Sequence, residues 1–431
     1  MLFRSMKNKI FMPQGVEDTH YNQLEIKENA TASFKDICKV HGYRQVLTPT
    51  LEYYDLFTDG TIHKDNMFKL IDGDGKILVL RPDVTTPIAR MVATNYKEAS
   101  GYLKFSYVSN VFRINDEQSG NKREFVQGGI ENIGDCKPDS DAEVISLAIK
   151  NLLNWGINEF KIDLGHVGFL KSATDVKITM EDKKHIFNLI ENKNQGELCL
   201  LLENLNISED IKKKIIQLPF LYGRPKDVLE KAESLVWNDR MHSSLQNLKE
   251  VYSILCEYGY EQYISVDLGM NSHINYYTGL IFKGYVSRYG KAVLSGGRYD
   301  DLSSHYGHHL PATGFGINID ELLEAMKMFG LKEELKCFTD YLILYDEETR
   351  KSGFELASTL RSKGFIVESD KVQGDMKMHI LNASSRNVRE ILQISEGKVK
   401  VIDLRGNQLY ACTLSQFVNK LNLEDSWVSI H

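Results

Sequence analysis

The chain has 431 residues and a net charge of −7, with 42% hydrophobic and 26% charged residues, an ordinary balance for a globular protein. This length predicts two or three domains rather than a single core. No stretch approaches the roughly 20 apolar residues of a membrane span, and the N-terminus carries no secretory apolar run, so we expect a cytoplasmic protein.

The composition and motifs also argue against several kinds of functional site. The six cysteines are scattered and form no CxxC pair, which argues against structural zinc or a disulfide framework. The twelve histidines show no metal-ligand spacing, and no Walker P-loop, HExxH or GxSxG motif is present. We therefore expect neither a metal nor a cofactor.

The N-terminal part reads as a sheet domain with helices. Apolar spacing predicts a helix over 19–42, followed by a strand that Pro49 interrupts. Residues 66–83 predict a hairpin around the turn signal Asp72–Gly75, and the sequence LRPDVTTPIAR then enters a helix. Strands at 106–115 and 124–134 precede a helix from Ser140 to Trp155.

Residues from about 172 to 258 change character and read as consecutive helices, which we interpret as an insertion in the sheet domain. Strands return between 263 and 318. After Lys336, strands alternate with helices, which predicts a separate α/β domain over 336–431. Within it we expect a strand at MKMHILNA and a helix near NVREILQI. This domain has 13 Lys+Arg and 13 Asp+Glu, hence a net charge of zero, so it is not an obvious RNA-binding surface.

The 105–134 hairpin carries the first candidate site. Alternate residues of a strand share a face, which groups Gln127, Gly129 and Glu131. By the same rule, the preceding strand groups Tyr107, Ser109, Val111 and Arg113. If the two faces coincide, an arginine, an amide and a carboxylate line one floor that suits a small polar ligand. An exposed sheet face with incidental polar residues explains the pattern equally well.

Further candidates lie in short motifs, each with a plainer alternative. In LRPDVT, Asp83 or Thr85 precedes a helix and could simply cap it. Tyr276 and Tyr277 in NYYTG could wall a pocket or end a core strand. The paired glycines of SGGRYDDL, before Arg298, permit close approach of a ligand or an ordinary tight turn.

The stretch PATGFGINIDELLEAM at 311–326 runs from a small-residue strand through two glycines into a helix. Such a junction favours an anion, but its first turn holds Asp320 and Glu321 and no cation.

In their order and spacing these motifs resemble the class II histidyl-tRNA synthetase family over about residues 10–330. The quoted segments are FMPQGVEDTH, LRPDVTTPIAR, FRINDEQSGNKREFVQGGIENIG, NYYTG, GGRYDDL and PATGFGINIDELL. The resemblance implies an α+β fold with an antiparallel sheet core, a core domain over 1–330 and a divergent anticodon-binding-like domain over 336–431.

Three positions depart from the synthetase pattern. The segment PATGFGINIDELL resembles motif three of the synthetases. There Glu321 replaces an arginine that would stabilise the ATP phosphates, and a carboxylate would repel them. Ser272 stands where the synthetases have a second arginine, four residues before the tyrosine pair. Arg113 resembles the arginine of motif two, but Asn115 replaces the glutamate that usually follows two residues later. The resemblance therefore implies that the amino-acid side of the site is kept and that the ATP side is lost.

This combination resembles the synthetases' non-catalytic relative, the regulatory subunit of ATP phosphoribosyltransferase. The resemblance implies a short-form catalytic partner, histidine as ligand, feedback control of the first step of histidine biosynthesis, a homodimer within a hetero-oligomer, and no tRNA binding. By this resemblance, Asp83 and Thr85 would hold the amino group of histidine. Gln127 and Glu131 would contact the amino acid from the sheet. The resemblance further assigns the imidazole to Tyr276 and Tyr277 and the carboxylate or a leftover anion to Arg113.

Two other readings stay open. A divergent but active histidyl-tRNA synthetase predicts histidine-dependent exchange between ATP and pyrophosphate. A free-standing histidine sensor predicts no complex with the phosphoribosyltransferase.

Overall fold

The computed structural model describes residues 12–57, 64–97, 101–114, 122–270, 276–330, 338–406 and 408–420. The chain divides into two compact units, Met1–Leu331 and Lys332–His431. Within the described ranges, no helix is both long and apolar enough to cross a bilayer. The same ranges gather no group of three or more His, Cys, Asp or Glu side chains that could hold a metal ion.

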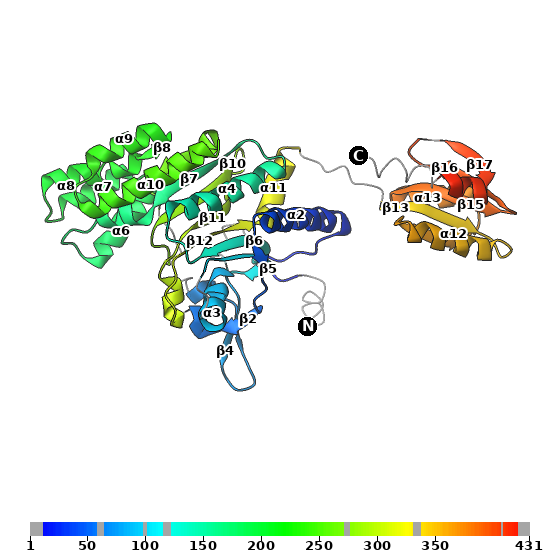
Figure 1. Ribbon diagram of the computed structural model, residues 1–431, viewed down its shortest axis with the longest axis horizontal. Coiled ribbons are helices and arrows are strands. Elements are labelled where there is room, and N and C mark those ends of the chain that lie inside the picture. Colours follow the sequence, from blue (N-terminus) through cyan, green and yellow to red (C-terminus); the bar gives the residue numbers. More distant parts are fainter. Residues whose placement is uncertain are drawn as a thin grey trace, which may run out of the picture. The chain divides into compact units, whose positions relative to one another are not determined.

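A nine-stranded sheet forms the centre of the first unit, in the order β1-β5-β6-β12-β11-β10-β7-β9-β8 (Figure 1). Neighbours from β5 through β7 pair antiparallel, whereas β1 with β5 and β7 with β9 pair parallel. This confirms the predicted α+β class with an antiparallel sheet core. The strands are β1 Arg44–Gln45, β5 Leu103–Phe112, β6 Glu124–Ile133, β7 Phe160–His166, β8 Tyr222–Gly223, β9 Ile264–Asp267, β10 Leu280–Val286, β11 Ala292–Arg298 and β12 Ala312–Asn318.

Helices cover the two faces of this sheet unequally. One face packs against α2 (Tyr21–Val40), α4 (Pro138–Asn154) and α11 (Ile319–Met328), as Figure 1 shows. On this face Phe34 of α2 lies edge-on to Phe315 of β12, with 6.4 Å between ring centroids. The opposite face carries α3 (Thr85–Asn95), whose apolar side chains cluster with Phe105 and Tyr107 of β5.

A small antiparallel sheet, β2-β4-β3, forms the predicted hairpin. Its strands are β2 Leu51–Tyr53, β3 Lys69–Ile71 and β4 Ile77–Leu80. The Asp72 carboxylate accepts hydrogen bonds from the Asp74 and Lys76 amides, and Gly75 takes a left-handed φ of 81°, which closes the turn. Arg81, directly after β4, donates to the backbone carbonyls of Thr48 and Asn110, so it ties the hairpin to β5.

The helical insertion of the first unit packs at the β7–β9–β8 end of the sheet (Figure 1). Four of its helices begin at side chains that accept a backbone hydrogen bond, namely Thr179, Asn194, Ser208 and Asn238. The helices are α5 Val167–Ala173, α6 Met180–Glu191, α7 Gln195–Glu203, α8 Glu209–Ile215, α9 Pro225–Leu235 and α10 Asp239–Glu257.

Short 3-10 helices occur in the first unit at Tyr54–Phe57, Lys64–Asn66, Leu218–Phe220, Glu261–Tyr263 and Leu302–Tyr306.

The second unit is a five-stranded α/β sheet in the order β14-β13-β15-β16-β17. Its helices pack into separate apolar clusters, α12 with one set of sheet side chains and α13 with the other. The elements are β13 Thr339–Tyr345, α12 Arg350–Ser362, β14 Val367–Lys371, α13 Met376–Ser385, β15 Val388–Ser395, β16 Lys398–Asp403 and β17 Leu409–Thr413.

Two predicted elements of this unit were wrong. The segment 376–383 is helical rather than extended, because Asp375 caps it by accepting from the Lys377 amide. The segment 387–394 is the strand β15 rather than a helix. It lies between β13 and β16, so Ile391 and Leu392 are both buried, and burial on two faces gave its sequence a spacing that resembles a helix.

Candidate functional site

The centre of the site is the face that β5 and β6 present to α3. Antiparallel pairing sets Tyr107 opposite Gly129 and Ser109 opposite Gln127, so the two predicted faces coincide. Glu131 lies on the same face as Gln127 and is only 1% exposed. The interpretation as an exposed sheet face is therefore wrong for Glu131. We call the cluster of Thr85, Tyr107, Gln127, Glu131, Tyr276, Tyr277 and Tyr299 the Glu131 site.

The Glu131 carboxylate is held from two sides. The Thr85 hydroxyl donates to Oε1 at 2.7 Å, and the Tyr299 hydroxyl donates to Oε2. Burial raises the pKa of Glu131 from 4.5 to about 8, although the hydrogen bonds from Tyr299 and Thr85 act to lower it. The group can thus change its protonation state near neutral pH, when a ligand alters its surroundings.

The glycines of β12 make room for these side chains. A Cβ atom on Gly314 would overlap the Glu131 carboxylate and the Ile130 carbonyl oxygen. A Cβ atom on Gly316 would lie 2.6 Å from Nε2 of Gln127. The two glycines at the sequence junction therefore accept the side chains of β6, and this close approach explains them without a phosphate.

Gln127 lies beside two groups from β5. Its Oε1 accepts a hydrogen bond from the Tyr107 hydroxyl at 3.3 Å. Ser109, opposite Gln127 in the register, has a buried hydroxyl oxygen without a partner among the described residues. Burial raises the pKa of Tyr107 well above its ordinary value, and the nearby charges of Glu131 and Asp83 act in the same direction.

Asp83 acts as a helix cap in this structure. Its carboxylate accepts from the Thr86 amide at 2.7 Å and from the Thr86 hydroxyl at 3.1 Å, at the start of α3. Burial raises the pKa of Asp83, while the Thr86 hydrogen bond and the charge of Arg113 act to lower it. Arg113 follows the end of β5, and its Nε donates to the Pro82 carbonyl at 2.7 Å. Asp83 and Arg113 thus adjoin the site, and Thr85 belongs to it.

Three tyrosine rings, those of Tyr276, Tyr277 and Tyr299, pack together in the Glu131 site. The centroids of Tyr276 and Tyr277 lie 4.8 Å apart, and those of Tyr276 and Tyr299 lie 5.4 Å apart. A Cβ atom on Gly297 would lie 2.9 Å from the Tyr277 ring. Because Gly297 is inside β11, the interpretation of this glycine pair as a tight turn is wrong; the pair accommodates aromatic side chains.

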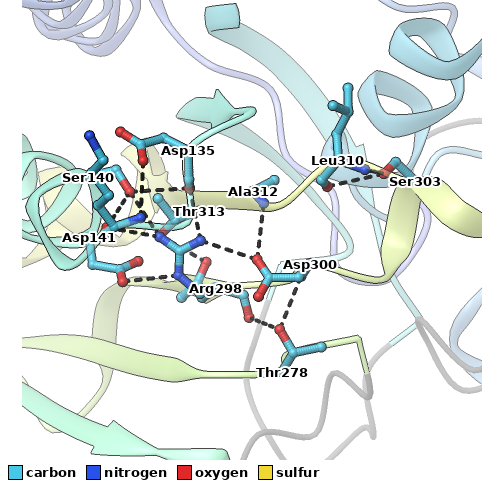
Figure 2. A network of polar contacts seen from close by, with 12 residues as sticks. Asp135, Ser140, Asp141, Thr278, Arg298, Asp300, Ser303, Leu310, Ala312 and Thr313 are labelled. Atoms are coloured by element: carbon cyan, nitrogen blue, oxygen red, sulfur yellow. Dashed lines mark hydrogen bonds and ion pairs between the residues drawn. The ribbon is translucent and has the colours of Figure 1, made fainter. Parts of the chain in front are cut away.

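Arg298 is committed to the fold rather than to a ligand. Figure 2 shows its guanidinium between the start of α4 and the segment after β11. Nε donates to Asp141 at 3.0 Å, and the terminal nitrogens donate to the Ser140 hydroxyl, the Asp135 carbonyl and Asp300. This buried network holds the end of β11 and so positions the adjacent Tyr299 for Glu131.

Glu321, which the resemblance aligns with an arginine of the synthetases, is held by two neighbouring side chains. The Tyr289 hydroxyl donates to the Glu321 carboxylate, and Nζ of Lys291 lies 3.7 Å from it. The neighbouring Asp320 accepts from Nζ of Lys27 and from the Val126 amide, both at 2.8 Å. Among the described residues, Lys27 and Lys122 form ion pairs with Asp320, and Lys291 forms one with Glu321. Asn115 and Ser272, the other two departures, lie outside the described residues.

The structure thus gathers Thr85, Gln127, Glu131, Tyr276 and Tyr277 in one place. Sequence reasoning had not assigned Tyr107 and Tyr299 to the site. The signal for Tyr107 was its place opposite Gly129 in a plausible hairpin register. Tyr299 lies in the quoted segment GGRYDDL, but strand spacing gave no signal for its contact with Glu131, which joins residues 168 positions apart.

Comparisons with known proteins agree with this geometry. A family model for histidyl-tRNA synthetase matches residues 15–322. A relative from Acetivibrio thermocellus, named ATP phosphoribosyltransferase regulatory subunit, is 37% identical over 414 residues, covering 95% of this chain and 99% of the relative. A relative of the same name from Clostridium acetobutylicum is 39% identical, covering 88% and 94%. The chain belongs to the ATP phosphoribosyltransferase regulatory subunit family.

Solved structures support this assignment. A Bacillus halodurans protein described as an ATP phosphoribosyltransferase regulatory subunit/histidyl-tRNA synthetase matches with a TM-score of 0.79 and 34% identity, covering 89% of this chain and 98% of that one. Histidyl-tRNA synthetase from Nostoc sp. PCC 7120 also reaches a TM-score of 0.79, but at 18% identity it shows the fold alone. These relatives are named as a regulatory rather than a catalytic subunit, in agreement with the prediction of a non-catalytic subunit.

The raised pKa of Glu131 predicts a pH-dependent stability. Between about pH 4.5 and pH 8 the unfolded chain has released this proton while the folded chain retains it, so the group favours unfolding increasingly as pH rises. We expect Glu131→Gln to gain stability relative to the wild type across this window, measured by urea denaturation. Glu124→Gln, at the other end of β6, is the control. A difference independent of pH would contradict the assignment.

The surroundings of the two β12 glycines predict that alanine is more destabilising at Gly314 than at Gly316. Gly314→Ala meets a fixed backbone carbonyl as well as a carboxylate, whereas Gly316→Ala meets a side-chain amide that can move. We expect Gly314→Ala to lower the free energy of unfolding by about 1–3 kcal/mol more than Gly316→Ala. Urea denaturation of the two variants checks the order, and equal losses would contradict it.

Proposed function

We propose that this chain binds L-histidine at the Glu131 site and serves as the regulatory subunit of a short-form ATP phosphoribosyltransferase. In that complex it supports the activity of the catalytic subunit and imposes feedback by histidine. The observation that carries the proposal is the contrast between a complete Glu131 site and an acid, Glu321, at the position of the ATP-binding arginine.

The chemistry of the Glu131 site suits histidine. An imidazole carries an N–H that a buried carboxylate can accept, and flat tyrosine rings can enclose its faces. In the proposal Glu131 and Gln127 contact the amino acid from the sheet floor, and Tyr276 and Tyr277 enclose the imidazole. Asp83 and Thr85 hold the amino group, and Arg113 balances the carboxylate. Asp83 and Arg113 would then exchange part of their present hydrogen bonds for the ligand.

The ATP side supports a regulatory rather than an aminoacylating role. A synthetase stabilises the rearranging phosphates with arginines, and a carboxylate near them would oppose that charge. Glu321 is held by Tyr289 and Lys291, and the resemblance aligns it with an arginine that contacts the phosphates in the synthetases. An active synthetase would show histidine-dependent exchange between ATP and pyrophosphate, and we expect none.

The second unit supports no tRNA-binding role. From Lys336 to His431 it has 13 basic and 13 acidic residues, which give no net positive charge. Asp346, Glu347 and Glu348 stand together directly after β13, before the start of α12. Three consecutive acids at this edge would repel a nucleic-acid backbone.

Reconstitution tests the proposed function. We would mix this chain with the short catalytic subunit from the same source and follow phosphoribosyl-ATP formation with and without histidine. We expect activity that requires this chain and that histidine suppresses. Gln127→Ala should weaken the inhibition by about tenfold, because a buried hydrogen-bonding group is lost. Gln246→Ala, exposed on α10, is the matched control. A catalytic subunit indifferent to this chain would overturn the proposal.

We also propose that the chain forms a homodimer through the small sheet. Leu51 and Tyr53 of β2 and Leu70 of β3 share one face of it, and they are 48%, 53% and 43% exposed. Such a contiguous apolar face suits a second copy of the chain.

Tyr53→Asp tests this interface. We expect the variant to shift the chain towards monomer in sedimentation experiments, because a charge would be buried at the contact. Ile71→Asp, on the opposite face of the same sheet, should leave the assembly unchanged. A Tyr53→Asp variant as dimeric as the wild type would contradict this placement.

A further inference from the structure

A four-residue segment, Asp267–Met270, lies between the helical insertion and the Glu131 site. It begins at the last residue of β9, and the Met270 amide donates to the Asp267 carbonyl at 3.2 Å, which makes the segment a tight turn. The Asp267 carboxylate also accepts from the Gly269 amide at 2.9 Å. The turn is therefore organised around one side chain.

That side chain is held by the insertion. Nζ of Lys193, in the turn between α6 and α7, lies 2.7 Å and 3.0 Å from the two oxygens of Asp267. Lys193 takes a left-handed φ of 56°, which is uncommon for a residue other than glycine. Its ammonium group also lies over the Tyr222 ring, 5.1 Å from the centroid. This φ belongs to the turn that ends α6, in which the Asn194 amide donates to the Leu189 carbonyl at 2.9 Å, and the turn places the cation beside Asp267.

Two backbone and packing contacts strengthen the same attachment. The Leu268 amide donates to the Leu221 carbonyl of the insertion at 2.9 Å. Gly269 lies directly beneath α6, because a Cβ atom there would be 2.9 Å from Nζ of Lys193 and 3.1 Å from Cγ2 of Ile190. A rigid movement of the insertion would carry this turn with it.

The other end of the turn enters the apolar surroundings of the site. Met270 is 6% exposed and belongs to the same cluster of buried side chains as Tyr277 and Tyr299. The turn packs tightly on β7, since a Cβ atom on Gly165 would lie 2.9 Å from both the Asp267 carbonyl oxygen and Cε of Met270. A displacement of Asp267 would therefore reach the packing around the tyrosines.

We infer that Lys193 and Asp267 are positioning residues that couple the helical insertion to the tyrosine wall of the Glu131 site. The insertion thereby sets the affinity of the site for its ligand, and a ligand or partner that shifts the insertion changes that affinity by linkage. The inference rests on the proposed histidine binding for its choice of ligand, but the mechanical coupling itself is testable without histidine.

The ligand-free test is hydrogen exchange on the whole chain. Lys193→Met keeps the length of the side chain and removes its charge. We expect faster amide exchange in peptides that cover 276–281 than in the wild type. Lys249→Met, which breaks the ion pair with Glu233 elsewhere on the insertion, should leave those peptides unchanged. Unaltered exchange in Lys193→Met would overturn the coupling, whatever histidine does.

The ligand test is calorimetric titration with histidine. A coupling of about 0.5–2 kcal/mol corresponds to a two- to thirtyfold weaker Kd in Lys193→Met. Lys193→Arg should restore most of the affinity, and adding Lys193→Met to Asp267→Asn should weaken binding little further. Additive losses, or a loss equal to that in Lys249→Met, would overturn the inference. Failure of the wild type itself to bind histidine would overturn the proposed ligand, while the exchange experiment would still decide the coupling.

Discussion

The buried carboxylate of Glu131 joins three parts of the chain that are distant in sequence. It receives one hydrogen bond from Thr85 at the start of α3 and another from Tyr299 after β11. A carboxyl group in such surroundings is costly unless it is hydrogen-bonded or protonated, and this one is favoured to stay protonated up to about pH 8. The neighbouring features, from the β12 glycines to the Arg298 network, are arranged so that this contact can form.

The same contact accounts for the conformational demands on the sheet. Bulky side chains from β6 point towards β12, so β12 must present glycines at Gly314 and Gly316. The Tyr277 ring lies against β11, so β11 must present Gly297. In a nucleotide-binding protein, glycines at a strand-to-helix junction admit phosphates. In this chain their space is taken by protein side chains, and the following helix begins with anchored acids.

Regulation by such a chain would need the site and the rest of the molecule to communicate. The two are connected by few contacts, because Lys193 of the insertion binds Asp267, and Met270 at the end of the same turn packs in one cluster with Tyr277 and Tyr299. Packed segments transmit displacement because close-packed interiors cannot absorb it locally. The proposed histidine site and the proposed coupling therefore use one continuous set of contacts.

The sequence alone determined the class of the core domain and the sharing of one face by Gln127 and Glu131, since strand alternation is a local property. Its resemblance to the synthetases also aligned Glu321 with an arginine of that family. Only the tertiary structure decided that Tyr299 reaches Glu131, that Arg298 serves the fold, and that the paired glycines make room for rings. It also showed that 376–383 is a helix and 387–394 a strand, the opposite of the prediction. For the strand, burial on both faces of β15 gave apolar spacing like that of a helix. These outcomes depend on contacts between residues far apart in sequence, which local spacing and propensity do not encode.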